Sequence, residues 1–113
     1  MMLQVYRLTF GLGEDAEGNS LMDSYALIEN ARELLIQAGF PGWTEYRGTG
    51  VWANPEGRIV TEPSITFTIG SDRPFIALQN VGHSLGRIFQ QRTFAYEDRA
   101  GMSLIDVIQP YPY

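Results

Sequence analysis

The chain has 113 residues, a formal net charge of −5, no cysteine and a single histidine, and all eight of its basic residues are arginine. The missing lysine and cysteine exclude Schiff-base and lysine-nucleophile catalysis, the phosphate-binding P-loop, thiolate chemistry and cysteine-containing zinc sites. The arginines are scattered singly through an acidic chain, which disfavours nucleic-acid binding because that function needs a basic face.

Length and composition favour one small domain. We expect a single α+β domain over residues 1–108, followed by a Pro/Tyr tail over residues 109–113. No apolar stretch approaches the roughly 20 residues of a membrane helix, and the N-terminus lacks a signal-peptide pattern. We therefore expect no membrane partner and, by default, a cytoplasmic location.

The first predicted strand spans residues 3–12. Its even-numbered residues, from Gln4 to Leu12, share one face, and the odd-numbered residues share the other. Both faces are partly apolar, which indicates a central strand with a semi-covered second face. An acidic, glycine-containing loop over residues 11–19 follows the strand.

The first predicted helix begins after this loop. Ser20 is expected to be the N-cap, with Asp23 as an acidic residue at the N3 position. Apolar residues recur at helical spacing from Leu27 to Ala38, and Gly39 is the expected C-terminal stop.

A β-hairpin is the strongest local prediction. Its first strand covers residues 44–53, and Asn54-Pro55-Glu56-Gly57 has the composition of a type I turn followed by a left-handed glycine. The return strand begins at Arg58, is interrupted by Pro63 and resumes over residues 64–69. A proline at that position implies a sheet edge or a bulge.

The second predicted helix follows a cap at Ser71 or Asp72. Its apolar stripe is predicted to comprise Phe75, Leu78, Val81 or Gly82, Leu85 and Phe89. Gly82 and Gly86 lie one turn apart, which suggests that the helix backbone closely approaches the sheet or the first helix. Two strands are expected after it, over residues 93–96 and 102–108.

This order of elements, βαββαβ with one extra strand, predicts a ferredoxin-like α+β fold in which two helices cover one face of an antiparallel sheet. The uncovered face would carry a mixture of polar and apolar side chains, namely Val5, Arg7, Thr9, Thr66 and Thr68. A mixed face of this kind favours a homodimer formed by face-to-face or edge contacts.

Several hairpin residues resemble a family of small uncharacterised bacterial and phage-type proteins, catalogued as a domain of unknown function. They are Phe40-Pro41-Gly42, Gly50-Val51-Trp52, Pro55, Gly57, Arg58-Ile59-Val60, Glu62 and Ser64. The resemblance covers about a third of the chain and implies the fold rather than an activity. The architecture is also similar to that of dimeric α-β barrel proteins, which include cofactor-free monooxygenases.

The candidate catalytic residues centre on His83, which shares a helix face with Arg87. Together they could act as a general acid or base beside an anion-binding group, and Glu45 or Asp106 could orient the imidazole across space. The alternative interpretation, an ordinary boundary histidine, is the commoner one.

Arg7, Arg47, Tyr46 and Trp52 form a candidate binding set on the first strand and the hairpin. Such residues dominate ligand and partner surfaces, although cross-strand packing and a surface ion pair are the commoner explanation for such a set. The acidic loop does not match the ligand spacing of a calcium loop, so we expect no metal site there.

The sequence thus favours a non-enzymatic binding or regulatory module that forms a homodimer, has no cofactor, and recognises a small ligand or a protein partner. The alternative is a cofactor-free enzyme of the α-β barrel type, catalysing proton transfer or an oxygenase-like reaction with His83, Arg87 and a carboxylate.

Overall fold

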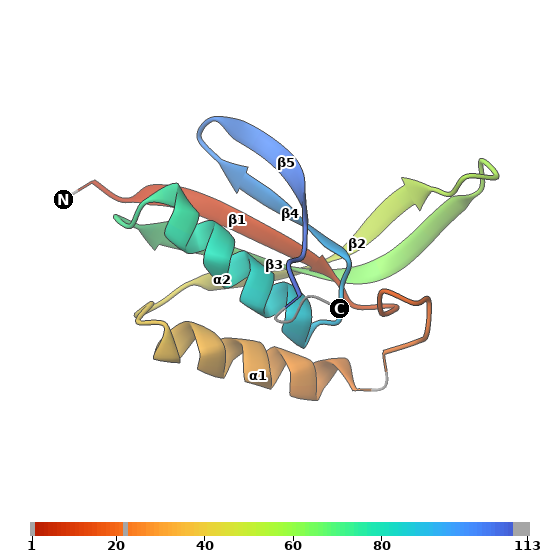
Figure 1. Ribbon diagram of the computed structural model, residues 1–113, viewed down its shortest axis with the longest axis horizontal. Helices are drawn as coiled ribbons and strands as arrows, with labels where there is room; N and C mark the ends of the chain where they lie inside the picture. Colours follow the sequence, from red (N-terminus) through yellow and green to blue (C-terminus); the bar gives the residue numbers. More distant parts are fainter. Residues whose placement is uncertain (1, 22, 110–113) are drawn as a thin grey trace.

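The computed structural model describes residues 2–21 and 23–109 as an antiparallel sheet with two helices (Figure 1). In chain order the elements are β1 (Gln4–Gly11), α1 (Ser24–Gln37), β2 (Thr44–Ala53), β3 (Ile59–Ser71), α2 (Phe75–Ile88), β4 (Thr93–Asp98) and β5 (Gly101–Asp106). The strands lie in the order β2-β3-β1-β4-β5. This arrangement confirms the predicted ferredoxin-like α+β class, with β5 as the additional edge strand.

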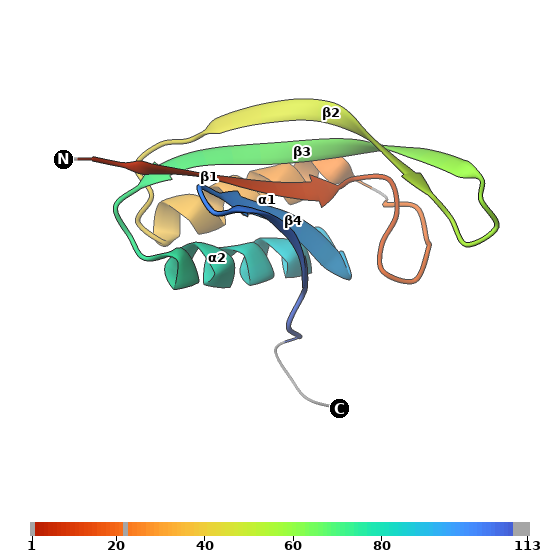
Figure 2. The ribbon, with the colours of Figure 1, turned by 90° about the horizontal axis from the view of Figure 1, so that it is seen from above.

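Both helices lie on the same side of the sheet (Figures 1 and 2). The buried core lies between the helices and the sheet. The predicted alternation of β1 is confirmed, because its even-numbered residues from Tyr6 to Leu12 are buried. They meet the buried face of β3 and the apolar stripes of the helices. That core includes Ile65, Phe67, Ile69, Ile28, Ala31, Leu35, Leu78, Leu85, Phe89 and Phe94.

Helix α1 begins three residues later than a Ser20 cap would place it. Asp23 is the N-cap, and its Oδ1 accepts a hydrogen bond from the Ala26 backbone N–H at 3.1 Å. Ser20 instead forms an isolated β-bridge with Glu14 inside the loop. Asp23 satisfies one of the free N–H groups at the helix start, which is the role the sequence analysis gave to Ser20.

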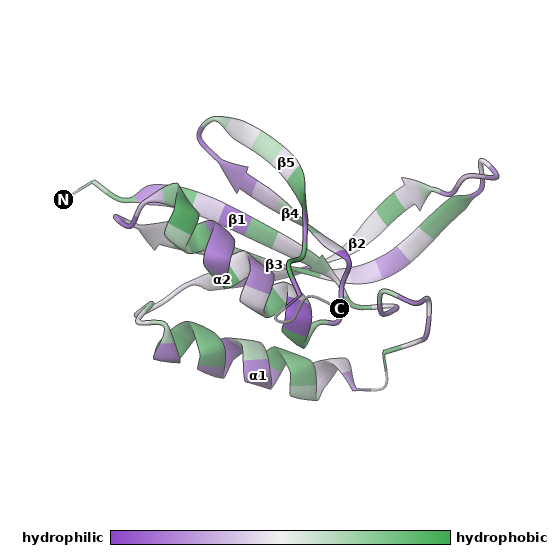
Figure 3. Ribbon diagram, viewed as in Figure 1, coloured by the Kyte–Doolittle hydropathy of each residue, from purple (hydrophilic) through white to green (hydrophobic). Residues whose placement is uncertain are grey.

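The predicted hairpin is confirmed together with its turn. The Gly57 backbone has φ +79°, and the Asn54 side chain accepts hydrogen bonds from the N–H groups of Glu56 and Arg58. The far end of the β2–β3 hairpin projects past both helices (Figures 1 and 2). Hydrophobic segments lie along this projecting part (Figure 3).

Pro63 does not interrupt β3, which runs continuously through it. The strand tolerates a proline there because β1 pairs with β3 only as far as Ser64, so the missing N–H lies where β3 has passed the end of its neighbour. The Pro63 carbonyl still accepts a hydrogen bond from Leu12 at 2.8 Å. The expectation of a local edge is confirmed, whereas the interruption is wrong.

Helix α2 starts from Pro74, without a side-chain cap. Neither Ser71 nor Asp72 caps it; the Ser71 hydroxyl accepts a hydrogen bond from the Arg73 backbone N–H instead. The close approach expected at the two helical glycines is confirmed. A Cβ at Gly82 would lie 2.4 Å from the Phe94 ring, and one at Gly86 would lie 2.5 Å from the Val107 side chain.

The last two strands pair over a turn that is tighter than predicted. β4 continues to Asp98 and β5 starts at Gly101, so only residues 99–100 connect them. The predicted tail keeps Gln109 within the described part of the chain, and residues 110–113 lie outside it. Among the described residues, no helix is long and apolar enough to cross a membrane.

Candidate functional site

The sheet face opposite the helices carries the odd-numbered residues of β1 and their cross-strand partners. Arg7 lies there beside Glu97, with Nη1 and Oε2 3.7 Å apart, and the Thr9 and Thr66 hydroxyls are 2.7 Å apart. Thr68 faces the same way, since it pairs with Arg7. The predicted composition of the uncovered face is therefore confirmed.

Four glycines converge on one corner of this face, so only the side chains of β3 project there. The register pairs Gly48 with Ser64 and Gly50 with Glu62, while Gly11 pairs with Ser64 from the other side. We call Gly11, Gly13, Gly48, Gly50, Glu62 and Ser64 the glycine-lined patch. The glycines of β2 leave their side of β3 open to a flat molecule, whereas the space above Gly11 and Gly13 is taken by the Glu62 side chain.

Glu62 supplies the carboxylate of this patch. Its side chain lies over β1, since a Cβ at Gly11 would come 2.7 Å from Oε1 and a Cβ at Gly13 would come 3.0 Å from the Glu62 Cβ. Within residues 2–21 and 23–109 no side-chain hydrogen bond or ion pair involves this carboxylate. A half-buried carboxylate without a partner is available to a ligand.

Two aromatic residues flank the patch on β2. Tyr46 precedes Gly48 and Trp52 follows Gly50 on the same strand face, and their side chains are 59% and 48% exposed. Trp52 pairs with Val60, so it is a diagonal neighbour of Glu62 and within reach of it. The geometry combines an anionic group with exposed rings, which suits a ligand that has a cationic centre and an aromatic base.

Sequence reasoning did not single out Glu62 as a functional residue, although a signal was present. The Asn54–Gly57 turn fixes the hairpin register, and that register puts Glu62 directly opposite Gly50. Counting strand pairs outward from the turn places Glu62 opposite Gly50, on the face that also carries Tyr46 and Trp52. The sequence alone therefore contained the information needed to find this carboxylate.

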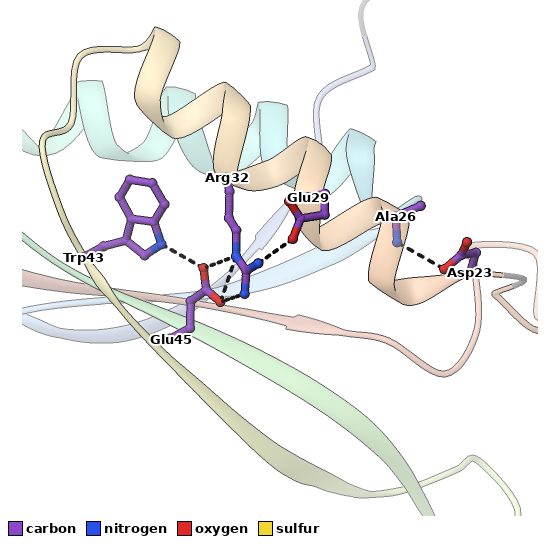
Figure 4. A network of polar contacts seen from close by, with 6 residues as sticks. All are labelled: Asp23, Ala26, Glu29, Arg32, Trp43 and Glu45. Atoms are coloured by element: carbon purple, nitrogen blue, oxygen red, sulfur yellow. Dashed lines mark hydrogen bonds and ion pairs between the residues drawn. The ribbon is translucent and has the colours of Figure 1, made fainter.

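Glu45 is occupied elsewhere and does not join the patch. On the helix-facing side, its carboxylate accepts hydrogen bonds from Arg32 at 2.7–3.2 Å and from the Trp43 indole at 2.9 Å (Figure 4). The Arg32 guanidinium holds the pKa of Glu45 below its usual value. The Glu45 side chain is only 18% exposed. Arg47 lies on this face too, apart from Tyr46 and Trp52. The network connects α1 to β2.

His83 and Arg87 lie together on α2, away from the other candidate catalytic residues. His83 Nδ1 accepts a hydrogen bond from the Ile108 backbone N–H at 3.1 Å, and its ring meets Phe94 edge-on. Burial, and then the charge of Arg87, lower the pKa of His83. Asp106 pairs with Thr93 and so points to the opposite face of the sheet. The structure therefore brings neither Glu45 nor Asp106 to His83.

A second polar cluster lies at the start of α2. The Tyr96 hydroxyl donates to Asp98 Oδ2 at 2.7 Å, and Asp98 Oδ1 accepts from the Ala100 N–H at 2.8 Å. Burial raises the pKa of Tyr96, and the Tyr96 hydrogen bond lowers the pKa of Asp98. Both carboxylate oxygens are already satisfied, so this cluster offers less to a ligand than Glu62 does.

The acidic loop organises itself through hydrogen bonds. Asp15 Oδ1 accepts from the N–H groups of Glu17 and Asn19, both at 2.9 Å, and these bonds keep the pKa of Asp15 low. Among the described residues, no group of three histidine or acidic side chains could hold a metal ion.

No family model matches the chain, and no curated protein matches it. Two similar solved structures show the same fold. The first is a phage SAM lyase in complex with S-methyl-5'-thioadenosine, with a TM-score of 0.68, 17% identity, and coverage of 97% of this chain and 93% of that one. The second is a phage SAM lyase in the apo state, with a TM-score of 0.64, 16% identity, and coverage of 97% and 92%.

These comparisons correct the functional expectation. The chain shares its fold, over nearly its whole length, with an enzyme, which contradicts the expectation of a non-enzymatic binding or regulatory module. They support the enzyme alternative instead. No family model supports the resemblance to a family of uncharacterised proteins, and the fold likeness to a phage protein agrees only with its phage-type part.

Proposed function

We propose that the protein is an enzyme that cleaves S-adenosylmethionine to S-methyl-5'-thioadenosine, and that the glycine-lined patch with Glu62 is its active site. The observation that carries the proposal is the unpartnered Glu62 carboxylate beside exposed aromatic rings, in a fold shared with a SAM lyase. Fold alone does not assign an activity, so the site chemistry has to support it.

The substrate and the product define the bond that breaks. S-adenosylmethionine carries a positive sulfonium, and release of the thioadenosine breaks the bond from sulfur to the methionine Cγ. The electron pair of that bond stays on sulfur, which becomes a neutral thioether. The reaction balances without water, a metal or a redox partner.

Two water-free routes complete this cleavage. In the first, a base removes a Cβ proton, the C–H electron pair forms a Cβ–Cγ double bond, and an unsaturated amino acid leaves. In the second, the substrate carboxylate attacks Cγ and closes a lactone. Glu62 can be the base in the first route, whereas in the second it can only hold the sulfonium in position.

The patch matches the charges and shape of this substrate. A carboxylate attracts the sulfonium, and the exposed Trp52 and Tyr46 rings can stack on adenine. If Glu62 only attracts the sulfonium, it binds the charged substrate more tightly than the neutral product. Such an effect lowers KM without raising kcat. The base and lactone routes therefore predict different effects of Glu62 on kcat.

The test is to incubate the protein with S-adenosylmethionine and to measure thioadenosine by liquid chromatography and the amino-acid fragment by mass spectrometry. Glu62→Gln removes the charge and is expected to lower kcat by about a hundredfold or more if Glu62 is the base. If the lactone forms, the loss is expected mainly in KM.

Glu56→Gln is the matched control, because Glu56 lies in the exposed turn of the same hairpin. It should leave the rate unchanged. Absence of thioadenosine with the unmodified protein would overturn the proposed activity. Equal kcat/KM values for Glu62→Gln and Glu56→Gln would overturn the location of the site.

We also propose that the protein forms a homodimer through the uncovered sheet face. This proposal is supported by four exposed apolar side chains that lie away from the glycine-lined patch. Two are at or just before the start of β1 and two are on β5. They are Leu3, Val5, Met102 and Leu104, which are between 49% and 74% exposed. Light scattering at micromolar concentration should give twice the monomer mass, and Leu104→Glu should give the monomer mass.

A further inference from the structure

Outside the proposed active site, a cavity of about 580 Å³ lies at the C-terminal end of α2. The loop before α1 closes it against the α2–β4 turn through three hydrogen bonds. The Ala16 N–H donates to the Gln90 carbonyl at 2.8 Å, Arg92 Nη2 donates to the Ala16 carbonyl at 2.8 Å, and Gln91 Nε2 donates to the Glu14 carbonyl at 2.7 Å. The cavity thus has a defined wall.

Two guanidinium groups give this cavity its charge. Arg87 and Arg92 line it, and in the described ranges neither has a carboxylate within 4 Å. Their hydrogen bonds to the Ile108, Ser84 and Ala16 oxygens leave further N–H groups unused. Among the described lining residues Glu17 alone is acidic, so they carry a net positive charge although the whole chain is acidic.

The rest of the lining supplies neutral hydrogen-bonding groups. The amide side chains of Gln90, Gln91 and Gln109 reach the same space. Gln90 has φ +57°, a left-handed backbone conformation that is uncommon for a residue with a side chain. Gln90 directly follows the C-cap Phe89, and this conformation ends α2 by letting the Gln91 N–H donate to the Gly86 carbonyl at 2.9 Å.

We propose that this cavity is a second binding site, which takes a small anion bearing a carboxylate or a phosphate. Planar guanidinium groups bind both anions through paired hydrogen bonds, and the volume is in the range of small-molecule sites. Arg87 belongs to the helix layer and Glu62 to the opposite sheet face, so this site is separate from the proposed active site and does not depend on it.

The experiment titrates sodium phosphate, and separately sodium succinate, into the full chain at constant ionic strength set with sodium chloride. Resonances of the Arg87 and Arg92 Nε–Hε groups report binding. We expect saturable shifts of both resonances with at least one of the two anions, and the anion with the lower Kd identifies the preferred group. Shifts that do not saturate, or that chloride reproduces, would overturn the proposal.

Two variants with opposite expected signs separate binding from folding. Arg92→Gln removes one charged donor and should weaken binding by about tenfold or more. Glu17→Gln removes an exposed negative charge from the cavity and should tighten anion binding. A variant that only damaged the fold would not bind the anion more tightly. Arg58→Gln, in the distant hairpin turn, should change nothing. Unchanged affinity in both cavity variants would contradict the site.

Discussion

At the scale of single residues, the arginines in contact with other groups mostly hold the fold together. Arg73 donates to the Ala38 and Gly39 carbonyls at 2.8 and 3.0 Å, at the end of α1, and lies 4.2 Å above the Phe40 ring. Arg32 connects α1 to β2 through Glu45. A planar guanidinium can donate hydrogen bonds to several acceptors at once, so arginine serves these capping and bridging positions better than lysine would. The arginine-only composition therefore has structural uses at specific positions.

His83 provides a pH-dependent prediction at this scale. Burial and the charge of Arg87 lower its pKa below the ordinary 6.5, so the unfolded chain binds its proton more readily than the folded one. The contribution of His83 to stability is thus complete above pH 6.5 and is lost as the pH falls through its folded pKa. Urea unfolding between pH 7 and 5 should show a falling free energy, and His83→Gln should flatten that slope. An identical slope in the variant would contradict this role.

At the scale of the elements, glycine residues serve two different purposes. Gly82 allows α2 to lie against β4, since any Cβ there would meet the Phe94 ring at 2.4 Å. Gly82→Ala should therefore destabilise the fold by about 1–3 kcal/mol despite the better helix propensity of alanine. Gly42→Ala is the matched control, because nothing lies within 4 Å of that position. Denaturant unfolding of both variants checks the prediction; equal stability would mean that α2 packs more loosely.

Gly11 serves the proposed site rather than the core. A Cβ at Gly11 would meet the flexible end of the Glu62 side chain, which can move aside at little cost. Gly11→Ala should therefore reduce thioadenosine formation about tenfold or more while leaving the unfolding midpoint nearly unchanged. The two assays together separate a displaced carboxylate from a damaged fold. Full activity in this variant would show that the position of Glu62 is irrelevant to turnover.

Some features of these elements could be predicted from the sequence alone, and others could not. Alternation predicted which face of β1 is buried, and the Asn54–Gly57 turn predicted the hairpin, because both signals are local. The cap at Asp23 instead of Ser20 depends on how the loop folds back through its bridge to Glu14, which is not local. The convergence of Gly11 and Gly48 on β3 likewise depends on strand order. For that reason the candidate site could be predicted only in part, through Tyr46 and Trp52.

At the scale of the whole molecule, the helices leave one sheet face free, and the two proposed sites lie on opposite sides of that sheet. The helix layer carries the arginine-lined cavity, whereas the uncovered face carries Glu62 and the exposed rings. The structure does not bring His83 together with Glu45 or Asp106, for a different reason in each case. Glu45 lies on the far edge strand β2, and Asp106 faces away from the helices.

The central claim, that the uncovered face binds the thioadenosine at Glu62, is tested most directly by titrating S-methyl-5'-thioadenosine into the protein and following its nitrogen–proton resonances. The chain has two tryptophans, and they lie on opposite faces of the sheet. The account predicts saturable shifts of the Trp52 indole and of the Gly11, Gly48 and Gly50 amides, with the Trp43 indole unmoved. Shifts confined to Trp43 and the helices, or no shift at all, would contradict it.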